Sequence, residues 1–298
     1  MTLAVATEGL RKAYPGGAGL HGVDLAVPEG SVYGLVGPNG AGKTTLLCLL
    51  AGLRRPDAGA IRFAVPLDRV AVCPDVPQFE PWLTAAEVVE LAGSLAAGPV
   101  DGAQVDRALE EAGLAGAAHR RVGTFSRGMT QRLALAATLV GDPAVVILDE
   151  PSSALDPAGR HEVLDLVARL GRDRTVLLSS HVLADVQRVC DTVGVLVEGR
   201  LRWQGEVARL LAEHVQPAWE VRVRGDAGAV AAALHGEPWV RTATADGNGR
   251  VRVEVTSMAA GEAHLVAALA ATGQPVVAVE PAADDLEDAF LRLAGGGT

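Results

Sequence analysis

The chain has 298 residues, of which 49% are hydrophobic and 21% are charged, and its formal net charge is −10. This composition supplies enough apolar surface for one or two globular domains and excludes a wholly disordered chain. The acidic balance lacks the broad basic footprint of nucleic-acid binding, so we predict no nucleic-acid partner. No apolar run reaches the roughly 18–20 residues that span a bilayer, and the N-terminus lacks a secretory pattern, so we expect a cytoplasmic protein.

The first two thirds of the chain alternate between strand-like and helix-like segments. Residues 20–36 are rich in β-branched residues and predict two strands, and residues 80–140 predict a helical, Ala/Leu-rich region. The segments AVVILDE (144–150) and TVLLSSH (175–181) are continuous apolar runs, typical of strands that are buried on both faces. Strands that alternate with helices favour an α/β fold with helices on both sides of a sheet.

The pattern changes after Pro217. Alternating and helical segments then follow in the order βαββαβ, which is the ferredoxin-like motif, and an amphipathic stretch ends the chain. We therefore predict two domains, residues 1–215 and a small α+β domain at 218–298, with a helical subdomain at about 80–140 in the first.

A glycine-rich segment between a predicted strand and a predicted helix carries the strongest functional signal. It matches the phosphate-binding pattern G-x-x-x-x-G-K-[ST] with Gly37, Pro38, Asn39, Gly40, Ala41, Gly42, Lys43 and Thr44, and Thr45 follows it. Glycines let backbone N–H groups surround phosphate oxygens at the positive end of a helix. Lys43 is expected to reach the β- and γ-phosphates of ATP, and the Thr44 hydroxyl to bind Mg²⁺.

Two acids close the buried strand at 144–150. Asp149 lies at the strand's carboxyl end, where nucleotide-hydrolysing proteins with this loop place a carboxylate that organises Mg²⁺. Glu150 follows, and we interpret it as the general base that accepts a proton from the attacking water.

With these motifs in place, residues 3–212 resemble the nucleotide-binding subunit of an ATP-binding cassette (ABC) transporter. The resemblance includes Phe125-Ser126-Arg127-Gly128-Met129, where the family usually has L-S-G-G-Q. Ser126 and Gly128 match that motif and are expected to bind the γ-phosphate from a helix N-terminus. The fold it implies is the phosphate-loop ABC ATPase domain, a mixed-sheet core with a helical subdomain.

The resemblance extends to further positions. His181 occupies the place of the family's switch histidine at the γ-phosphate, and Tyr14 that of the aromatic residue that stacks on adenine. The family's Q-loop glutamine, a Mg²⁺ ligand, aligns with Asp75, and Gln78 is the alternative if the loop is shifted. Phe79 and Trp82 follow, either as buried core residues or as anchors for a permease.

The resemblance also implies a function and partners. It predicts an ATP-hydrolysing subunit that powers transport, in the export direction, through a separate membrane permease at the inner face of the membrane. It also implies a head-to-tail dimer with another copy of the chain or a paralogous subunit. Each nucleotide site would combine Lys43 and Glu150 of one chain with Ser126 and Gly128 of the other. The C-terminal extension is similar to that of drug- and polyketide-exporter subunits. The alternative is a soluble single-cassette ATPase in cofactor or complex assembly.

Overall fold

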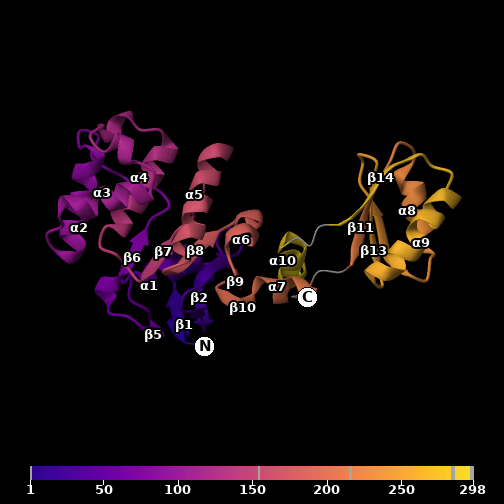
Figure 1. Cartoon of the computed structure of the whole chain (residues 1–298). Helices are drawn as coiled ribbons and strands as arrows, with labels where there is room; N and C mark the ends of the chain where they lie inside the picture. Colours follow the sequence, from indigo (N-terminus) through magenta and orange to yellow (C-terminus); the bar gives the residue numbers. More distant parts are fainter. Residues whose placement is uncertain (1, 154, 215–216, 283–285, 296–298) are drawn as a thin grey trace. The chain divides into compact units, whose positions relative to one another are not determined.

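The computed structural model describes residues 2–153, 155–214, 217–282 and 286–295 (Figure 1). The chain divides into two compact units: one comprises Met1–Leu210 with Phe290–Thr298, and the other comprises Leu211–Ala289. The boundary predicted near 215–218 falls partly on residues 215 and 216, which lie outside the described residues. Helix α10 (Leu286–Gly295) contributes residues to both units, whereas the sequence placed this whole stretch in the second domain.

The first unit contains two sheets. In the smaller one, β1 pairs antiparallel with β2, β3 and β5. The larger has the order β10-β9-β4-β8-β7-β6, in which only the β10–β9 pair is antiparallel. The predicted mixed-sheet α/β core is thereby confirmed. The strands are β1 Leu3–Ala13, β2 Gly19–Val23, β3 Ala26–Pro28, β4 Val32–Val36, β5 Ala58–Phe63, β6 Val70–Cys73, β7 Val145–Leu148, β8 Thr175–Ser180, β9 Thr192–Val197 and β10 Arg200–Glu206.

The centre of the larger sheet is apolar on both faces. Every residue of β4, β7 and β8 is buried. Central parallel strands are covered on both sides by helices, which is why their sequences are continuous rather than alternating apolar runs. The three strands are parallel and end at the same edge of the sheet, and the residues that follow them there are the predicted phosphate loop, the two acids and His181.

Helices complete the first unit, with short 3₁₀ turns between some of them. α2 packs against α3 and α4, and these three helices form a group at the upper left of Figure 1. The helices are α1 Lys43–Leu50, α2 Ala85–Ala97, α3 Gly102–Glu111, α4 Arg127–Leu139, α5 Pro157–Leu170, α6 Leu183–Val189 and α7 Val207–His214, and the 3₁₀ turns are Pro15–Gly17, Leu67–Arg69, Ala115–Ala117 and Val122–Thr124.

Capping boxes fix where two of these helices begin. The Thr84 hydroxyl accepts a hydrogen bond from the Glu87 N–H, and the Glu87 carboxylate accepts one from the Thr84 N–H in return. Asp101 and Gln104 make the same reciprocal pair at the start of α3. Each box satisfies two N–H groups that a helix N-terminus leaves without partners. Among the described residues, no helix has the length and apolarity to cross a bilayer.

The second unit has the predicted βαββαβ order. Its antiparallel sheet has the strand order β12-β13-β11-β14, and α8 and α9 pack against it. The elements are β11 Ala218–Val223, α8 Ala227–His235, β12 Val240–Ala245, β13 Arg250–Val255, α9 Met258–Ala271 and β14 Val276–Pro281. The unit has a core of its own, with Val221, Val230, Val253 and Leu265 among its buried residues.

Gly261 of α9 shows how closely this small core is packed. A Cβ atom at Gly261 would lie 2.2 Å from Nε1 of Trp219. At Gly236, which ends α8 with φ −82°, the nearest atom to such a Cβ would be 4.0 Å away. The packing therefore requires glycine at position 261 but has room for a side chain at position 236.

We predict that Gly261→Ala lowers the free energy of unfolding of the second unit by about 1–3 kcal/mol, because overpacking forces the indole or the helix to move. The matched variant Gly236→Ala should leave stability unchanged or raise it by about 0.4–1 kcal/mol. Urea unfolding followed by tryptophan fluorescence measures both. Equal effects of the two substitutions would contradict the packing of Trp219 on α9.

Candidate active site

The phosphate-binding loop joins the central strand β4 to α1. Gly42 is the N-cap residue of α1 and has φ +105°, a left-handed conformation that side-chain-bearing residues rarely adopt. A Cβ atom at Gly37 would lie 2.2 Å from the backbone oxygen of Leu196 in β9. The loop therefore needs glycine at both positions, one for its turn and one for its close approach to the sheet.

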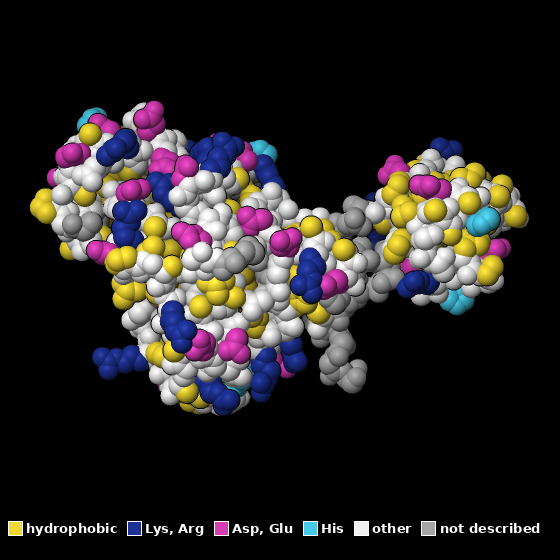
Figure 2. Space-filling view, turned by 60° about the horizontal axis from the view of Figure 1, so that its bottom comes forward, with side chains coloured by type: hydrophobic (Ala, Val, Ile, Leu, Met, Phe, Trp, Pro, Cys, Tyr) yellow, Lys and Arg dark blue, Asp and Glu magenta, His cyan; other side chains and the backbone are white. Residues whose placement is uncertain are grey.

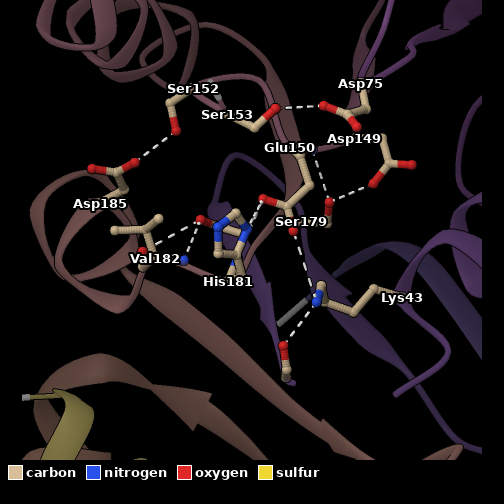
Figure 3. Close-up of polar contacts among 12 residues, drawn as sticks. Lys43, Asp75, Asp149, Glu150, Ser152, Ser153, Ser179, His181, Val182 and Asp185 are labelled. Atoms are coloured by element: carbon tan, nitrogen blue, oxygen red, sulfur yellow. Dashed lines mark hydrogen bonds and ion pairs between the residues drawn. The ribbon is translucent and has the colours of Figure 1, made fainter. Parts of the chain in front are cut away.

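Lys43 begins α1 and folds back across this loop. Its Nζ donates hydrogen bonds to the backbone oxygens of Gly37 at 2.7 Å and Pro38 at 3.4 Å, and it lies 3.7 Å from Oε1 of Glu150. Only 7% of Lys43 is exposed. The ammonium group is thus fixed between the loop and the carboxylate that follows β7 (Figure 3).

Asp149 and Glu150 form a tight turn directly after β7. Glu150 has φ +46°, in the left-handed region, and such strain in a residue with a side chain is typical of functional sites. The fully buried Ser179 of β8 supports the turn: its hydroxyl donates to Oδ1 of Asp149 at 2.6 Å and accepts from the Glu150 N–H at 2.9 Å. The sequence analysis did not identify Ser179, because its role depends on the pairing of β7 with β8.

The Glu150 carboxylate lies between two basic side chains. Oε2 accepts hydrogen bonds from Nδ1 of His181 at 2.7 Å and from the His181 backbone N–H at 3.3 Å, while Oε1 faces Lys43. Glu150 is therefore oriented by contacts on both of its oxygens, as a general base must be if it is to meet an attacking water in one geometry.

Asp75 reaches the same site from the loop after β6. Its Oδ1 accepts a hydrogen bond from the Ser153 hydroxyl at 2.5 Å. Both Asp75 and Ser153 line the cavity of the phosphate loop, whereas Gln78 is exposed and lines a different cavity. Of the two residues that the sequence offered for the Q-loop position, the geometry supports Asp75.

A cavity of about 490 Å³ brings most of the predicted residues together. Three predicted residues lie just outside it. The backbone oxygens of Gly37 and Pro38 accept hydrogen bonds from the lining residue Lys43, and Asp149 is hydrogen-bonded to the lining residue Thr44. Tyr14 is at its edge, with its ring 5.4 Å from the Arg54 guanidinium and its hydroxyl hydrogen-bonded to Arg54. The lining residues are Tyr14, Ala18, Gly19, Asn39, Gly40, Ala41, Gly42, Lys43, Thr44, Thr45, Asp75, Glu150, Ser153 and His181.

Ser126 and Gly128 do not line this cavity. Ser126 is the exposed N-cap residue of α4, and its hydroxyl accepts a hydrogen bond from the Met129 N–H at 3.3 Å. Gly128 lies in the first turn of the same helix. The two residues therefore present a helix N-terminus on the surface, separate from the phosphate loop of their own chain.

The acidic side chains beside Lys43 fit a magnesium ion that is shared with a nucleotide. Burial raises the pKa of Asp149 above its ordinary value, as do the charges of Asp75 and Glu150, while hydrogen bonds from Ser179 and Thr44 lower it. The two hydrogen bonds therefore compensate the negative charge of Asp149 only in part. Within the described ranges no three His, Cys, Asp or Glu side chains form a metal site by themselves. Magnesium is commonly held by one or two carboxylates together with substrate phosphates, which suits Asp149, Asp75 and the Thr44 hydroxyl.

Comparisons with known proteins agree with this geometry. Residues 20–153 match the family described as ABC transporter. An uncharacterized ABC transporter ATP-binding protein of Bacillus subtilis (strain 168) is 36% identical over 292 residues, covering 96% of this chain and 98% of the relative. The daunorubicin resistance ATP-binding protein of Streptomyces coeruleorubidus is 34% identical, and the match covers 98% of this chain and 96% of the relative. A solved ATP-binding subunit of an ABC transporter is 29% identical with a TM-score of 0.62, covering 71% of this chain and 93% of that one.

The raised pKa of Asp149 predicts a conflict between stability and metal binding. Because the folded chain holds the proton more tightly than the unfolded chain, ionised Asp149 destabilises the fold above its raised pKa, and this penalty disappears as the pH falls through it. We expect Asp149→Asn to raise the Tm at pH 8 in EDTA, and the gain to shrink as the pH is lowered.

Calorimetry with Mg²⁺ and ATP provides the second half of this test. Wild-type protein should gain Tm when both are added, and the Asp149→Asn variant should lose most of that gain. Asp106→Asn, which removes an exposed carboxylate on α3, is the matched control and should change neither quantity. A lower Tm for Asp149→Asn in EDTA at pH 8 would be inconsistent with a half-buried charge that is only partly compensated.

Proposed function

This chain belongs to the ATP-binding subunits of ABC transporters, and from that premise we propose that it powers the export of a small molecule through a separate membrane permease. It is an ATPase, because ATP hydrolysis is the activity that defines these subunits. The relative named for daunorubicin resistance supports export, since its similarity spans 98% of this chain and so includes the second unit. In this proposal the chain lies at the inner face of the membrane, bound to its permease.

The observation that carries the proposed mechanism is the chain of contacts from Lys43 through Glu150 to His181. The loop N–H groups and Lys43 hold the β- and γ-phosphates, and Glu150 takes a proton from the water that attacks the γ-phosphate. His181 uses Nδ1 to orient Glu150, so its other ring nitrogen, Nε2, is the one available to the γ-phosphate. Tyr14 supplies a ring for adenine.

Magnesium would be held by Asp149, Asp75 and the Thr44 hydroxyl, and when bound it neutralises charge on the β- and γ-phosphates. Ser179 fixes the carboxylate of Asp149 and the backbone of Glu150 relative to each other. The metal ligand and the general base are consequently positioned by one buried hydroxyl.

A second subunit would complete each site. Ser126 and Gly128 lie at the N-terminus of α4, outside their own chain's cavity, and Ser126 is exposed. A helix N-terminus binds phosphate oxygens well, so these residues are placed to serve the γ-phosphate held by another copy or a paralogous subunit. The head-to-tail arrangement follows from this division of the binding groups between chains.

The alternative of a soluble ATPase in complex assembly has less support. Relatives that match nearly the full length of this chain include an ABC transporter ATP-binding protein, a bacitracin transport ATP-binding protein and a drug resistance ATP-binding protein. On the face drawn in Figure 2, Lys and Arg side chains alternate with Asp and Glu side chains over the first unit, which is no sign of a nucleic-acid surface there.

An apolar groove in the first unit is a place for a permease helix to bind. It has a volume of about 460 Å³, and one wall is the segment after Asp75. Phe79 lines this groove but Trp82 does not, and the alternative that Trp82 is a core residue is wrong, because 64% of it is exposed. Exposed Leu91 and Leu95 add apolar surface on α2. The groove is lined by Leu67, Asp68, Val70, Ala71, Val72, Pro74, Pro77, Gln78, Phe79, Ala92, Ala96, Ala134, Ala137, Thr138, Gly141 and Pro143.

We predict that Glu150→Gln forms a stable dimer with ATP, because nucleotide still binds while the proton acceptor for hydrolysis is lost. Light scattering should show doubling of the mass with ATP, and steady-state turnover should fall by at least about 100-fold. Adding Lys43→Ala to this variant should abolish the dimer. A protein that stays monomeric with ATP at all concentrations would refute the shared site.

Trp82→Ala should weaken binding of the permease, since exposed aromatic residues often anchor interfaces at a cost of about 2 kcal/mol or more on truncation. The probe is the permease that co-purifies with the wild-type chain from its own membranes in detergent. Val266→Ala, at a residue that is 66% exposed on α9, is the control. If the two variants retain equal amounts of permease, Trp82 is not an anchor.

A further inference from the structure

Two consecutive serines after Glu150 each donate to a carboxylate from another part of the chain (Figure 3). The Ser152 hydroxyl donates to Oδ2 of Asp185 at 2.6 Å, and the Ser153 hydroxyl donates to Oδ1 of Asp75 at 2.5 Å. Asp185 is almost fully buried and also binds Arg160, so its charge is paired. Asp75 lines the nucleotide cavity instead. The two bonds are alike in chemistry but differ in what surrounds them.

The bond from Ser153 connects the β6 loop to the β7 turn. The Ser153 N–H donates to the Glu150 backbone oxygen at 3.0 Å, which closes the turn that carries the general base. The Asp149 N–H donates to the Cys73 backbone oxygen at 2.9 Å, which holds the two strand ends together. Ser153 is therefore fixed in position, and its hydroxyl in turn fixes the carboxylate of Asp75.

The hydrogen bond from Ser153 uses only one of the two carboxylate oxygens of Asp75. Oδ1 is occupied by Ser153, so Oδ2 is the oxygen that remains for a metal ion. Asp75 lines the same cavity as Thr44, and the Thr44 hydroxyl is hydrogen-bonded to Asp149. Aspartate is one methylene shorter than the glutamine usual in the family, so it has less reach and depends more on how its loop is held.

We propose that Ser153 is a positioning residue that holds Asp75 in place as a magnesium ligand, so that the Ser153–Asp75 hydrogen bond sets the affinity for the magnesium–nucleotide complex. The inference rests on the proposed function of this site. Hydrogen bonds to charged groups are stronger than those between neutral groups, and losing one at a water-accessible site weakens binding less than losing one at a buried site.

The test is nucleotide binding rather than turnover. Calorimetric titration of the full chain with the non-hydrolysable analogue adenylyl imidodiphosphate is carried out once with Mg²⁺ and once with EDTA. Ser153→Ala should weaken binding about 3–10-fold with Mg²⁺ and leave the EDTA affinity unchanged. Ser153→Thr, which keeps the hydroxyl, should restore the magnesium effect. Ser152→Ala is the matched control, since it removes the neighbouring hydrogen bond without touching Asp75.

A double-mutant cycle identifies the route of the effect. If Ser153 acts through Asp75, Ser153→Ala should add nothing in a chain that already carries Asp75→Ala. An equal loss with Mg²⁺ and with EDTA, or additive losses in the cycle, would overturn the inference and leave Ser153 a purely structural residue. A wild-type chain that binds no nucleotide under either condition would instead refute the proposed function. Asp75→Asn gives an independent reading of the magnesium effect if Ser153→Ala fails to fold.

Discussion

The position of the Glu150 carboxylate is the constraint on which the rest of the site depends. Glu150 follows a fully buried strand, turns the chain with a left-handed backbone conformation, and contacts Lys43 on one side and His181 on the other. Each of these groups comes from a different strand end or helix start. Their contact is possible because β4, β7 and β8 are neighbours in one parallel sheet and end at the same edge. A parallel sheet thus collects residues that are more than a hundred positions apart in the chain.

The electrostatics of the site follow from the same arrangement. Asp149 is half-buried, and with Asp75 and Glu150 nearby its negative charge is offset only in part by the neighbouring hydroxyl groups. The fold tolerates this cost because the hydrogen bonds of Ser179 and Ser153 hold the carboxylates in place. A bound cation would relieve this repulsion, so that metal binding and stability would be coupled through the same side chains.

The second unit has a separate core and, unlike the larger sheet of the first unit, a sheet that is antiparallel throughout. In its antiparallel sheet, β13 alternates between buried and more exposed residues, and the missing side chain of Gly261 lets α9 lie close to Trp219. Its core is complete without residues of the phosphate loop or the acids. The nucleotide chemistry therefore resides wholly in the first unit, and the second adds a separate folded element that relatives over the full length share.

The sequence by itself determined the features that depend on local pattern. Spacing alone located the phosphate loop, apolar runs located the buried strands and the acids at their ends, and alternation located the βαββαβ unit. Tertiary structure decided what depends on contacts between distant segments. It placed Asp75 rather than Gln78 in the nucleotide cavity, exposed Trp82, and kept Ser126 and Gly128 away from their own chain's phosphate loop. It also revealed the hydrogen bonds of Ser179 and Ser153, because a partner 30 or 78 residues away is defined only when the strands pair.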